Sequence, residues 1–258
     1  MRLYFKYLGI LLKSRMQYKA SFVMLSFGHF LVSFTGFLGM FFLFDRFHTV
    51  KGYSFEEVLL CFSTVTLSFA ISECFVRGFD SFSGLIKTGD LDRILIRPRS
   101  VVFQVLTSKM EFSRVGRLIA AVGVFAYAAP KSGVDWTLGK AGAVFLMVVG
   151  GIAVFSALFM IYAGFSFFTI EGLEFMNIFT DGTKEFGRYP LSIYGKELLF
   201  AYTFIIPIAP FQYYPFLYLI GQTDRTWYAL LPLMGFLFLI PAYIFFRFGL
   251  RRYRSTGS

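Results

Sequence analysis

Three long stretches without a formally charged side chain constrain this protein more than any other feature of its sequence. Residues 20–44, 141–170 and 226–246 contain no Asp, Glu, Lys or Arg. Because about 20 apolar residues in a helix cross the hydrocarbon core of a bilayer, each stretch predicts a membrane-spanning helix. Hydrophobic residues make up 57% of the chain and charged residues 16%, whereas a soluble domain has about 25% charged residues. The sequence therefore predicts an all-α polytopic membrane protein and excludes a soluble or disordered chain.

Three further spans are predicted from weaker signals. One contains Glu73 near its inner boundary, one is short and must include the turns that carry Arg114 and Arg117, and one is interrupted by prolines. Long arginine side chains reach the membrane surface from such positions by snorkelling. No internal repeat or linker divides the chain. We therefore predict one domain, 1–258, with six transmembrane helices at residues 20–44, 57–78, 110–130, 141–169, 197–215 and 226–247.

The distribution of basic residues predicts the orientation of these helices. Cytoplasmic segments of membrane proteins carry an excess of Lys and Arg, and most of the 25 basic residues lie before the first span or after the second, fourth and last spans. The segment after the fourth span is assigned to the cytoplasm because it holds Lys184, Arg188 and Lys196. Both termini are therefore predicted to be cytoplasmic. Because the basic residues lie between apolar stretches, we interpret the positive net charge as a signal of membrane orientation and not of nucleic-acid binding.

Residues 1–19 predict a helix that lies on the inner membrane surface. Residues Arg2, Lys6, Gly9, Lys13 and Gln17 recur at helical spacing, and apolar residues occupy other positions. A basic amphipathic helix of this kind lies in the membrane interface, so membrane lipid is an expected partner. The segment lacks the long apolar core and the cleavage site of a signal peptide. An extended basic leader is the alternative.

Motifs for catalysis and metal binding are missing from the sequence. Its two Gly-Lys pairs are not part of a phosphate-binding loop, so the chain cannot hydrolyse ATP by that route alone. The histidines, His29 and His48, have no His or Cys partner at metal-ligand spacing, and neither H-E-x-x-H nor G-x-S-x-G occurs. The cysteines, Cys61 and Cys74, are expected to be core residues. We predict no enzyme activity, no catalytic residue, no metal site and no cofactor bound by the chain itself.

Two ionisable residues within the predicted spans are candidates for an intramembrane polar site. Glu73 lies one helical turn before Arg77, and His29 lies about a third of the way through the first span. Ionisable groups inside a membrane are costly and are functional candidates for that reason. A structural pair of Glu73 with Arg77, or with a residue of the third span, is favoured over a proton relay. For His29, a packing role is favoured over a substrate contact.

The loop between the second and third spans carries the most informative pattern. Gly89 can end one helix, and Asp90 can cap the next by accepting backbone hydrogen bonds. Arg97 precedes a proline, which disfavours helical conformations and ends the second helix. The apolar face of that helix is formed by Leu91, Ile94 and Leu95. A short helix with charged flanks either docks on a soluble partner or lies on lipid headgroups, and the residues alone do not decide between the two.

This loop resembles that of ABC transporter permeases of the ABC-2 exporter type. The matching residues are Gly89, Leu91, Asp92, Leu95, Arg97 and Pro98. Six predicted spans and a basic amphipathic N-terminus agree with that family, and a later stretch resembles one bacterial subfamily in particular. That stretch contains Phe186-Gly187-Arg188-Tyr189-Pro190, followed by Pro207, Pro210, Tyr214 and Pro215.

The resemblance implies a fold and a set of partners. An ABC-2-type permease forms a dimer with a second permease, identical or paralogous. Two copies of a separate cytoplasmic ATPase bind ATP and Mg and drive efflux across the bacterial inner membrane. A coupling helix, here residues 84–97, would dock on the ATPase, and its polar contacts would be Asp90, Asp92, Arg93 and Arg97. Short re-entrant helices would close the outer end of the substrate path around Pro207, Pro210, Tyr214 and Pro215.

Two functions from other classes stay open. A secondary transporter or channel would work without an ATPase and would depend on Glu73 or His29. A membrane scaffold would recruit a soluble protein through the same basic loop. Separately, Glu171, Glu174, Asp181 and Glu185 recur near helical spacing. They predict an acidic inner helix that is either a solvated face or a cover for the ATPase or the pore.

Overall fold

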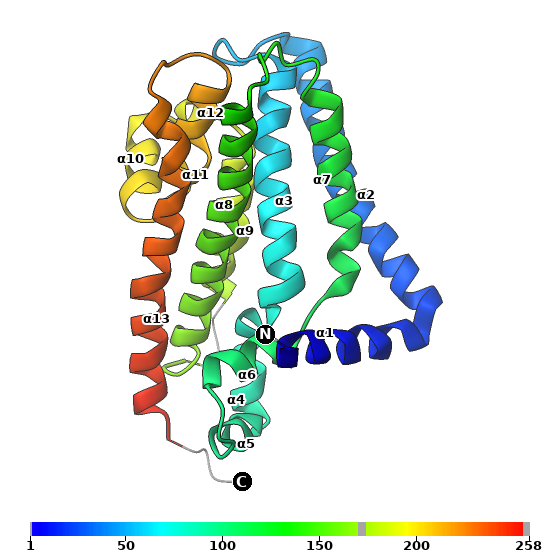
Figure 1. Cartoon of the computed structure of the whole chain (residues 1–258), viewed down its shortest axis with the longest axis vertical. Coiled ribbons are helices and arrows are strands. Elements are labelled where there is room, and N and C mark those ends of the chain that lie inside the picture. The colour runs from blue at the N-terminus through cyan, green and yellow to red at the C-terminus, as the bar shows by residue number, and fades with distance from the viewer. Residues whose placement is uncertain (1, 170–173, 255–258) are drawn as a thin grey trace.

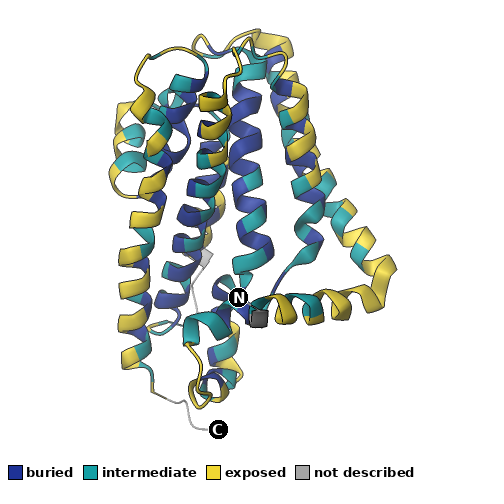
Figure 2. Ribbon diagram, in the orientation of Figure 1, coloured by how far each residue is buried: buried dark blue, intermediate teal, exposed yellow. Residues whose placement is uncertain are grey.

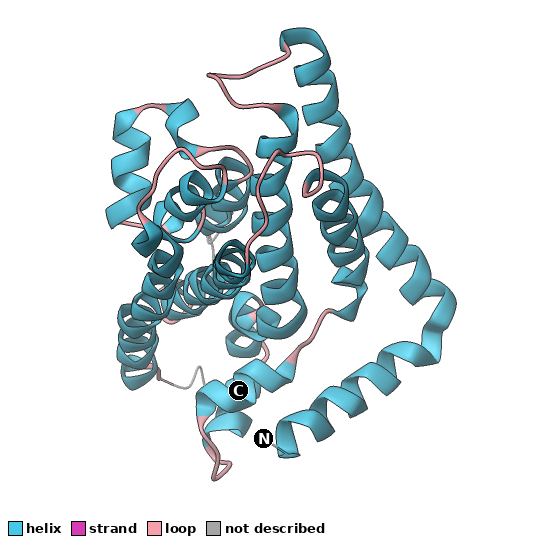
Figure 3. Cartoon of the chain, turned by 45° about the horizontal axis from the view of Figure 1, so that its top comes forward, coloured by secondary structure: helices cyan, strands magenta, loops and turns pink. Residues whose placement is uncertain are grey.

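The computed structural model describes residues 2–169 and 174–254. Within these residues, four helical stretches are long and apolar enough to cross a membrane, and they correspond to the first, second, fourth and sixth predicted spans. Figures 1 and 3 show a bundle of helices joined by loops. The long helices are α2 (Lys19–Phe47), α3 (Phe55–Asp80), α8 (Leu138–Phe165) and α13 (Met234–Arg252).

The N-terminal helix α1 (Arg2–Arg15) does not continue straight into α2. A short 3-10 turn, η1 (Met16–Tyr18), separates the two helices, and α1 runs across the foot of the bundle (Figure 1). Phe5 and Ile10 on α1 are exposed. The segment is helical, so the alternative of an extended leader is wrong.

The second long helix, α3, is the centre of the bundle. Its start is set by a capping box in which the Ser54 side chain accepts from the Glu57 backbone N–H and the Glu57 carboxylate accepts from the Ser54 N–H. Figure 2 shows α3 buried along most of its length, whereas much of α1 and the outer faces of α2 and α13 are exposed. Ser68 and Ser72 also donate hydrogen bonds to backbone carbonyls of α8, at 3.2 and 3.3 Å. These bonds join two buried helices.

The third predicted span is shorter than residues 110–130. The 3-10 turn η2 (Phe112–Arg114) leads into α7 (Val115–Ala128), which has 14 residues. At 1.5 Å per residue this helix is about 21 Å long, less than the thickness of a hydrocarbon core. It packs against α2 and α3, and the arginines at its start point into the protein.

The acidic segment forms α9 (Glu174–Gly187), which runs back along the bundle against α3 and α8 (Figure 1). Residues 171–173 of the predicted acidic pattern lie outside the described residues. The Lys184 ammonium lies 4.8 Å from the Phe69 ring centroid and the Arg188 guanidinium 5.1 Å from that of Phe62, both on α3. The next residues reach the α2–α3 loop, where Lys51 donates to the Ile193 carbonyl at 2.9 Å.

The prediction that Lys184 and Arg188 lie in a cytoplasmic loop with the other basic residues is therefore wrong. They lie along the bundle, between its two ends. The prediction counts every Lys and Arg as an unpaired positive charge. In the structure, Lys184 is 2.9 Å from the carboxylate of Asp181, and Arg188 contacts the carboxylate of Glu185. Because these pairs form within one segment, the charges are neutralised locally and carry little topological information.

Residues 197–215, predicted as one span, form a broken helical hairpin instead. A 3-10 turn, η3 (Leu191–Tyr194), precedes α10 (Lys196–Phe204), which is followed by α11 (Ile208–Phe211) and α12 (Tyr213–Leu219). The two arms are linked by Thr203 and Tyr214, whose hydroxyls are 3.3 Å apart. A long 3-10 segment, η4 (Thr226–Leu233), then leads into α13. Pro207 lies at the break between α10 and α11, and a proline lacks the backbone N–H that a continuous helix needs.

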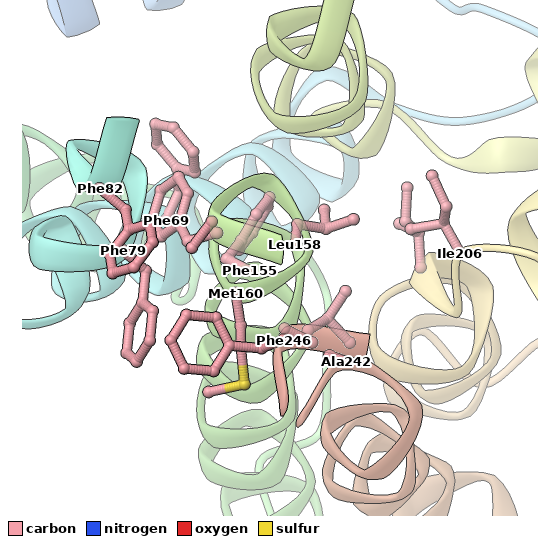
Figure 4. Close-up of a cluster of buried hydrophobic side chains, with 14 of the residues drawn as sticks. Phe69, Phe79, Phe82, Phe155, Leu158, Met160, Ile206, Ala242 and Phe246 are labelled. Carbon is pink, nitrogen blue, oxygen red and sulfur yellow. The ribbon is translucent and has the colours of Figure 1, made fainter. Parts of the chain in front are cut away.

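Aromatic side chains fill much of the core (Figure 4). Phe69 and Phe155 pack edge to face with ring centroids 5.0 Å apart, and Phe79 and Phe82 each pack on Phe246, at 5.5 and 5.4 Å. Such pairs contribute about 0.5–1.5 kcal/mol beyond the area they bury. They join α3 and the residues just after it to α8 and α13, so these helices form one packed unit.

Candidate functional site

The loop between α3 and α7 forms short helices that extend from the foot of the bundle. They are α4 (Phe82–Lys87), α5 (Asp90–Leu95) and α6 (Val101–Ser108). Gly89 separates α4 from α5 with a φ of +72°, a left-handed conformation that glycine adopts without steric cost. The helix break predicted at Gly89 is therefore present, and residues 84–97 comprise parts of two helices rather than one.

The helix α5 has a buried side and a charged side. Leu91 and Ile94 are buried in the main core, while the Arg93 side chain is 73% exposed. Leu95 and Arg97 are also exposed, so Leu95 does not share the buried face that the sequence predicted. The apolar side thus anchors the segment and leaves its basic side available for contact with another molecule.

Asp90 does not cap α5 as predicted. Gly89 occupies the N-cap position, and no side chain in the described part of the chain caps the helix there. The Asp90 carboxylate instead accepts from the Thr88 hydroxyl at 2.8 Å and from Arg93 Nη1 at 3.3 Å. These contacts hold the turn between α4 and α5 in shape, and the carboxylate also favours helix formation at the first turn.

Asp92 interacts electrostatically with the chain's own C-terminal segment, which the sequence did not indicate. Burial and the Asp92 carboxylate raise the pKa of Tyr253, the residue that follows α13. The Tyr253 ring also packs on Phe167 with centroids 6.1 Å apart. Phe167 in turn contacts Phe82 of α4 at 5.0 Å. The α4–α5 segment is therefore connected by packed rings to the residue that follows the last long helix.

A second group of charged side chains lies within the bundle, above the α4–α5 segment. Glu73 of α3 contacts three arginines, of which Arg77 is 3.2 Å away, Arg114 is 3.5 Å away and Arg117 is in direct contact. Glu73 and Arg117 are both buried. We refer to these four residues as the Glu73 cluster.

The Glu73 cluster contains the predicted ion pair between Glu73 and Arg77. It also shows that Arg114 and Arg117 do not reach outward to the membrane surface as predicted. Glu73 pairs with Arg77 and also with two arginines at the start of α7. The snorkelling predicted for Arg114 and Arg117 does not occur, because a buried carboxylate is a better partner than distant headgroups. His29 of α2 joins the cluster, with its Nδ1 3.1 Å from Arg114 Nη1. Since Arg114 can only donate there, His29 accepts and does more than pack.

The prolines predicted to mark an outer re-entrant region lie in the α10–α12 hairpin. Pro207 immediately precedes α11, and Pro210 and Pro215 are buried within α11 and α12. Tyr214 packs on Tyr228 of η4 with centroids 5.3 Å apart. The hairpin lies toward the end of the bundle opposite α1 (Figure 1).

Residues for metal or redox chemistry do not come together in the part of the chain that the structure describes. It contains no group of three or more His, Cys, Asp or Glu side chains that could hold a metal ion. Cys61 and Cys74 are free and buried, as expected of core residues.

The protein's family follows from a comparison with known sequences. The sequence model of one family, described as ABC-2 family transporter protein, matches residues 30–257. The chain belongs to this family. The match covers α3 to α13 and most of α2, including the α4–α5 segment and the α10–α12 hairpin. Searches of the curated proteins and of the solved structures each found no match.

Membership of the ABC-2 family agrees with the apolar helices and identifies the chain as a membrane permease component of an ABC transporter. Such a component works with an ABC ATPase and generally has no ATPase site of its own. The resemblance recognised in the loop at Gly89 is thereby confirmed at the level of the family.

Proposed function

We propose that this chain is the permease subunit of an ABC exporter in a bacterial inner membrane, with both termini in the cytoplasm. It crosses the membrane six times, with α7 and α9 as the third and fifth crossings. Two copies of a separate ATPase bind ATP and Mg, and a second permease, identical or paralogous, completes the transport path. The proposal rests on the family membership and on the arrangement of charged side chains at the foot of the bundle.

The observation that carries the proposal is the anchored, charged α4–α5 segment. Its apolar side is buried in the main core, and its exposed side presents Arg93 and Arg97 beyond the foot of the bundle (Figure 1). A helix that only rested on headgroups would need an apolar side turned to the lipid. Here most of the apolar side is already buried, which favours docking of a soluble partner.

Ring contacts give the docked segment a mechanical connection to the spans. Phe82 of α4 packs on Phe246 of α13 and on Phe167 after α8, at 5.4 and 5.0 Å. Because packed cores move as units rather than deforming continuously, a displacement of α4–α5 by the ATPase would be transmitted to α13 and α8. ATP-driven closure of the two ATPase subunits would thus move the walls of the path.

The outer face of α9 supports the presence of a second permease. The side chains of Asp181 and Glu185 are 58% and 53% exposed, although α9 packs along the membrane-spanning helices α3 and α8. Exposed carboxylates at membrane depth face protein or water rather than lipid. We infer that this face lines a hydrated path between two permeases and that the α10–α12 hairpin closes its outer end.

Docking through α5 is tested by the double substitution Arg93→Ala with Arg97→Ala. The tagged chain is expressed with its neighbouring genes and purified in mild detergent. We expect an ATPase subunit to copurify with the unaltered chain. The amount of ATPase that copurifies with the double variant should be at least about tenfold lower, because arginines are often the residues on which binding at an interface depends. ATP hydrolysis by the purified complex should fall in parallel.

The control for this experiment is Arg225→Ala, which removes an exposed arginine at the opposite end of the bundle. It should leave the ATPase bound. Purification of the unaltered chain without any ATPase would contradict the proposed function, and full retention by the double variant would contradict the docking site. Asp92 is left intact in this design because it raises the pKa of Tyr253 within the same chain.

No observation favours the secondary transporter over this proposal. Glu73, the residue on which such a transporter would depend, has three arginine partners. These ion pairs join α3 to η2 and α7, which is the structural role that the sequence favoured for Glu73.

A further inference from the structure

A cavity of about 390 Å³ lies at the elbow between α1 and α2. Its walls come from the last turn of α1, the turn η1, the first turns of α2, and Glu111 and Ser113 before α7. Figure 1 shows these segments enclosing a triangle at the foot of the bundle, where α2 diverges from α7. The volume is in the range of pockets that bind small ligands.

The position of the cavity determines which molecules surround it. An interfacial helix lies at the boundary between headgroups and acyl chains, and α1 has exposed apolar side chains such as Phe5 and Ile10. From Lys19 onward, α2 continues along the bundle as an apolar span. The elbow between the two helices is therefore at the depth of phospholipid headgroups, which makes phospholipid the amphiphile that meets this cavity.

The lining of the cavity carries one positive and one negative side chain. Arg15 Nη2 and Glu111 Oε1 are 3.5 Å apart, and the two side chains are 50% and 21% exposed. Lys109, outside the cavity lining, places its ammonium 3.8 Å from the same Glu111 oxygen. A closed charge-assisted hydrogen bond would be about 2.7–2.9 Å long. The longer separation leaves hydrogen-bonding capacity on both groups for a third molecule. Leu11, Phe22 and Leu25 supply an apolar wall beside them.

We propose that this cavity binds the headgroup of a phospholipid that carries both a phosphate and a primary ammonium. Arg15 binds the phosphate, Glu111 accepts hydrogen bonds from the ammonium, and the apolar wall contacts the first methylenes of an acyl chain. An anionic headgroup without an amine leaves Glu111 facing negative charge. A trimethylammonium headgroup has no N–H to donate. The pair of charges therefore selects one class of phospholipid.

Occupation of the cavity would connect the elbow to the Glu73 cluster. The Glu111 backbone N–H donates to the Cys74 carbonyl of α3 at 3.1 Å, and its own carbonyl accepts from the Arg114 N–H at 3.0 Å. Arg114 in turn contacts Glu73. A headgroup that joins Arg15 to Glu111 would thus fix α1 and α2 to the start of α7 and would stabilise the whole foot of the bundle.

The test uses the full-length chain purified in detergent and native mass spectrometry with three added phospholipids of identical acyl chains. Their headgroups are phosphoethanolamine, phosphocholine and phosphoglycerol. We expect the phosphoethanolamine lipid to bind roughly tenfold more tightly than the other two, the size expected for one charge-assisted hydrogen bond. Equal binding of all three lipids would overturn the proposal.

Two variants assign the binding to this cavity. Arg15→Ala should weaken binding of the phosphoethanolamine lipid roughly tenfold, and because Arg15 is half exposed this change leaves the fold intact. Glu111→Gln should abolish the preference over phosphocholine while keeping some binding. The matched control is Lys13→Ala, an exposed basic residue of α1 outside the cavity lining. If Arg15→Ala binds the lipid as the unaltered chain does, or if Lys13→Ala weakens binding as much, the assignment to the elbow cavity is wrong.

Discussion

Glu73→Gln should lower the free energy of unfolding by about 3–5 kcal/mol, the usual cost of removing one partner from a buried ion pair. The substitution keeps the size of the side chain but removes the one carboxylate shared by Arg77, Arg114 and Arg117. Arg117 would then be a buried cation that has lost its carboxylate partner. Because the cluster joins α3 to α7 and η2, the foot of the bundle should loosen first.

Reversible unfolding in mixed detergent micelles measures this effect. The control is Asp45→Asn, which removes an exposed carboxylate at the other end of α2 and should change stability by no more than about 0.5 kcal/mol. Transport that fails in a Glu73→Gln chain of unchanged stability would reinstate the proton-relay hypothesis. A chain that is both stable and active would show that the cluster is dispensable.

Gly116→Ala should destabilise the protein by about 3 kcal/mol, at the upper end of the usual cost of overpacking. A Cβ atom at this position would lie 1.7 Å from the Ser26 carbonyl oxygen and 3.0 Å from the Phe30 backbone nitrogen, both in α2. Backbone atoms of a helix cannot rotate away as a side chain can. The two helices would have to separate, and Arg114 and Arg117 would be displaced from Glu73.

The same substitution at a second glycine of α7 provides a matched control. A Cβ atom added at Gly123 would meet no neighbouring atom of the described residues within 4 Å, and alanine is favoured over glycine within a helix by about 1 kcal/mol. Gly123→Ala should therefore leave stability unchanged or raise it. Thermal unfolding of the two variants in the same detergent compares them directly. Equal midpoints would show that α2 and α7 are not in close contact in the membrane.

These expectations share a physical picture of the foot of the bundle. The α4–α5 segment is joined to α13 through ring contacts among Phe82, Phe167 and Phe246, and the Glu73 cluster joins α3 to α7 above it. A force applied at α5 therefore reaches several of the long helices through packed side chains. The proposed coupling to an ATPase needs a connection of this kind, since a flexible loop would absorb the displacement.

The parts of the fold that could be predicted depend on local sequence. The apolar stretches that begin at residues 20, 141 and 226 lie in long helical segments, because burying the backbone in a membrane requires continuous helical hydrogen bonding. The break at Gly89 follows from the conformational freedom of glycine, and the N-terminal helix follows from its periodicity. The family resemblance carried by Gly89 and the residues after it rests on the same kind of local pattern.

The placement of charge could not be predicted in the same way. Whether Arg114 and Arg117 reach outward to headgroups or inward to Glu73 depends on how close α7 lies to α3, and these residues are far from Glu73 along the chain. A count of basic residues places Lys184 and Arg188 in the cytoplasm, because their neutralisation by Asp181 and Glu185 and their contacts with rings of α3 are visible only in space.

The sequence by itself determined that this chain is an α-helical membrane protein, that its longest charge-free stretches are helical, and where the α4–α5 segment bends. Each of these properties arises from residues close together along the chain. Only the tertiary structure decided that Glu73 contacts three arginines, that residues 197–215 form a broken hairpin, and that His29 lies beside Arg114. The reason is that a buried charge takes whichever partner the packing of distant helices brings within a few ångströms, and hydropathy does not encode that distance.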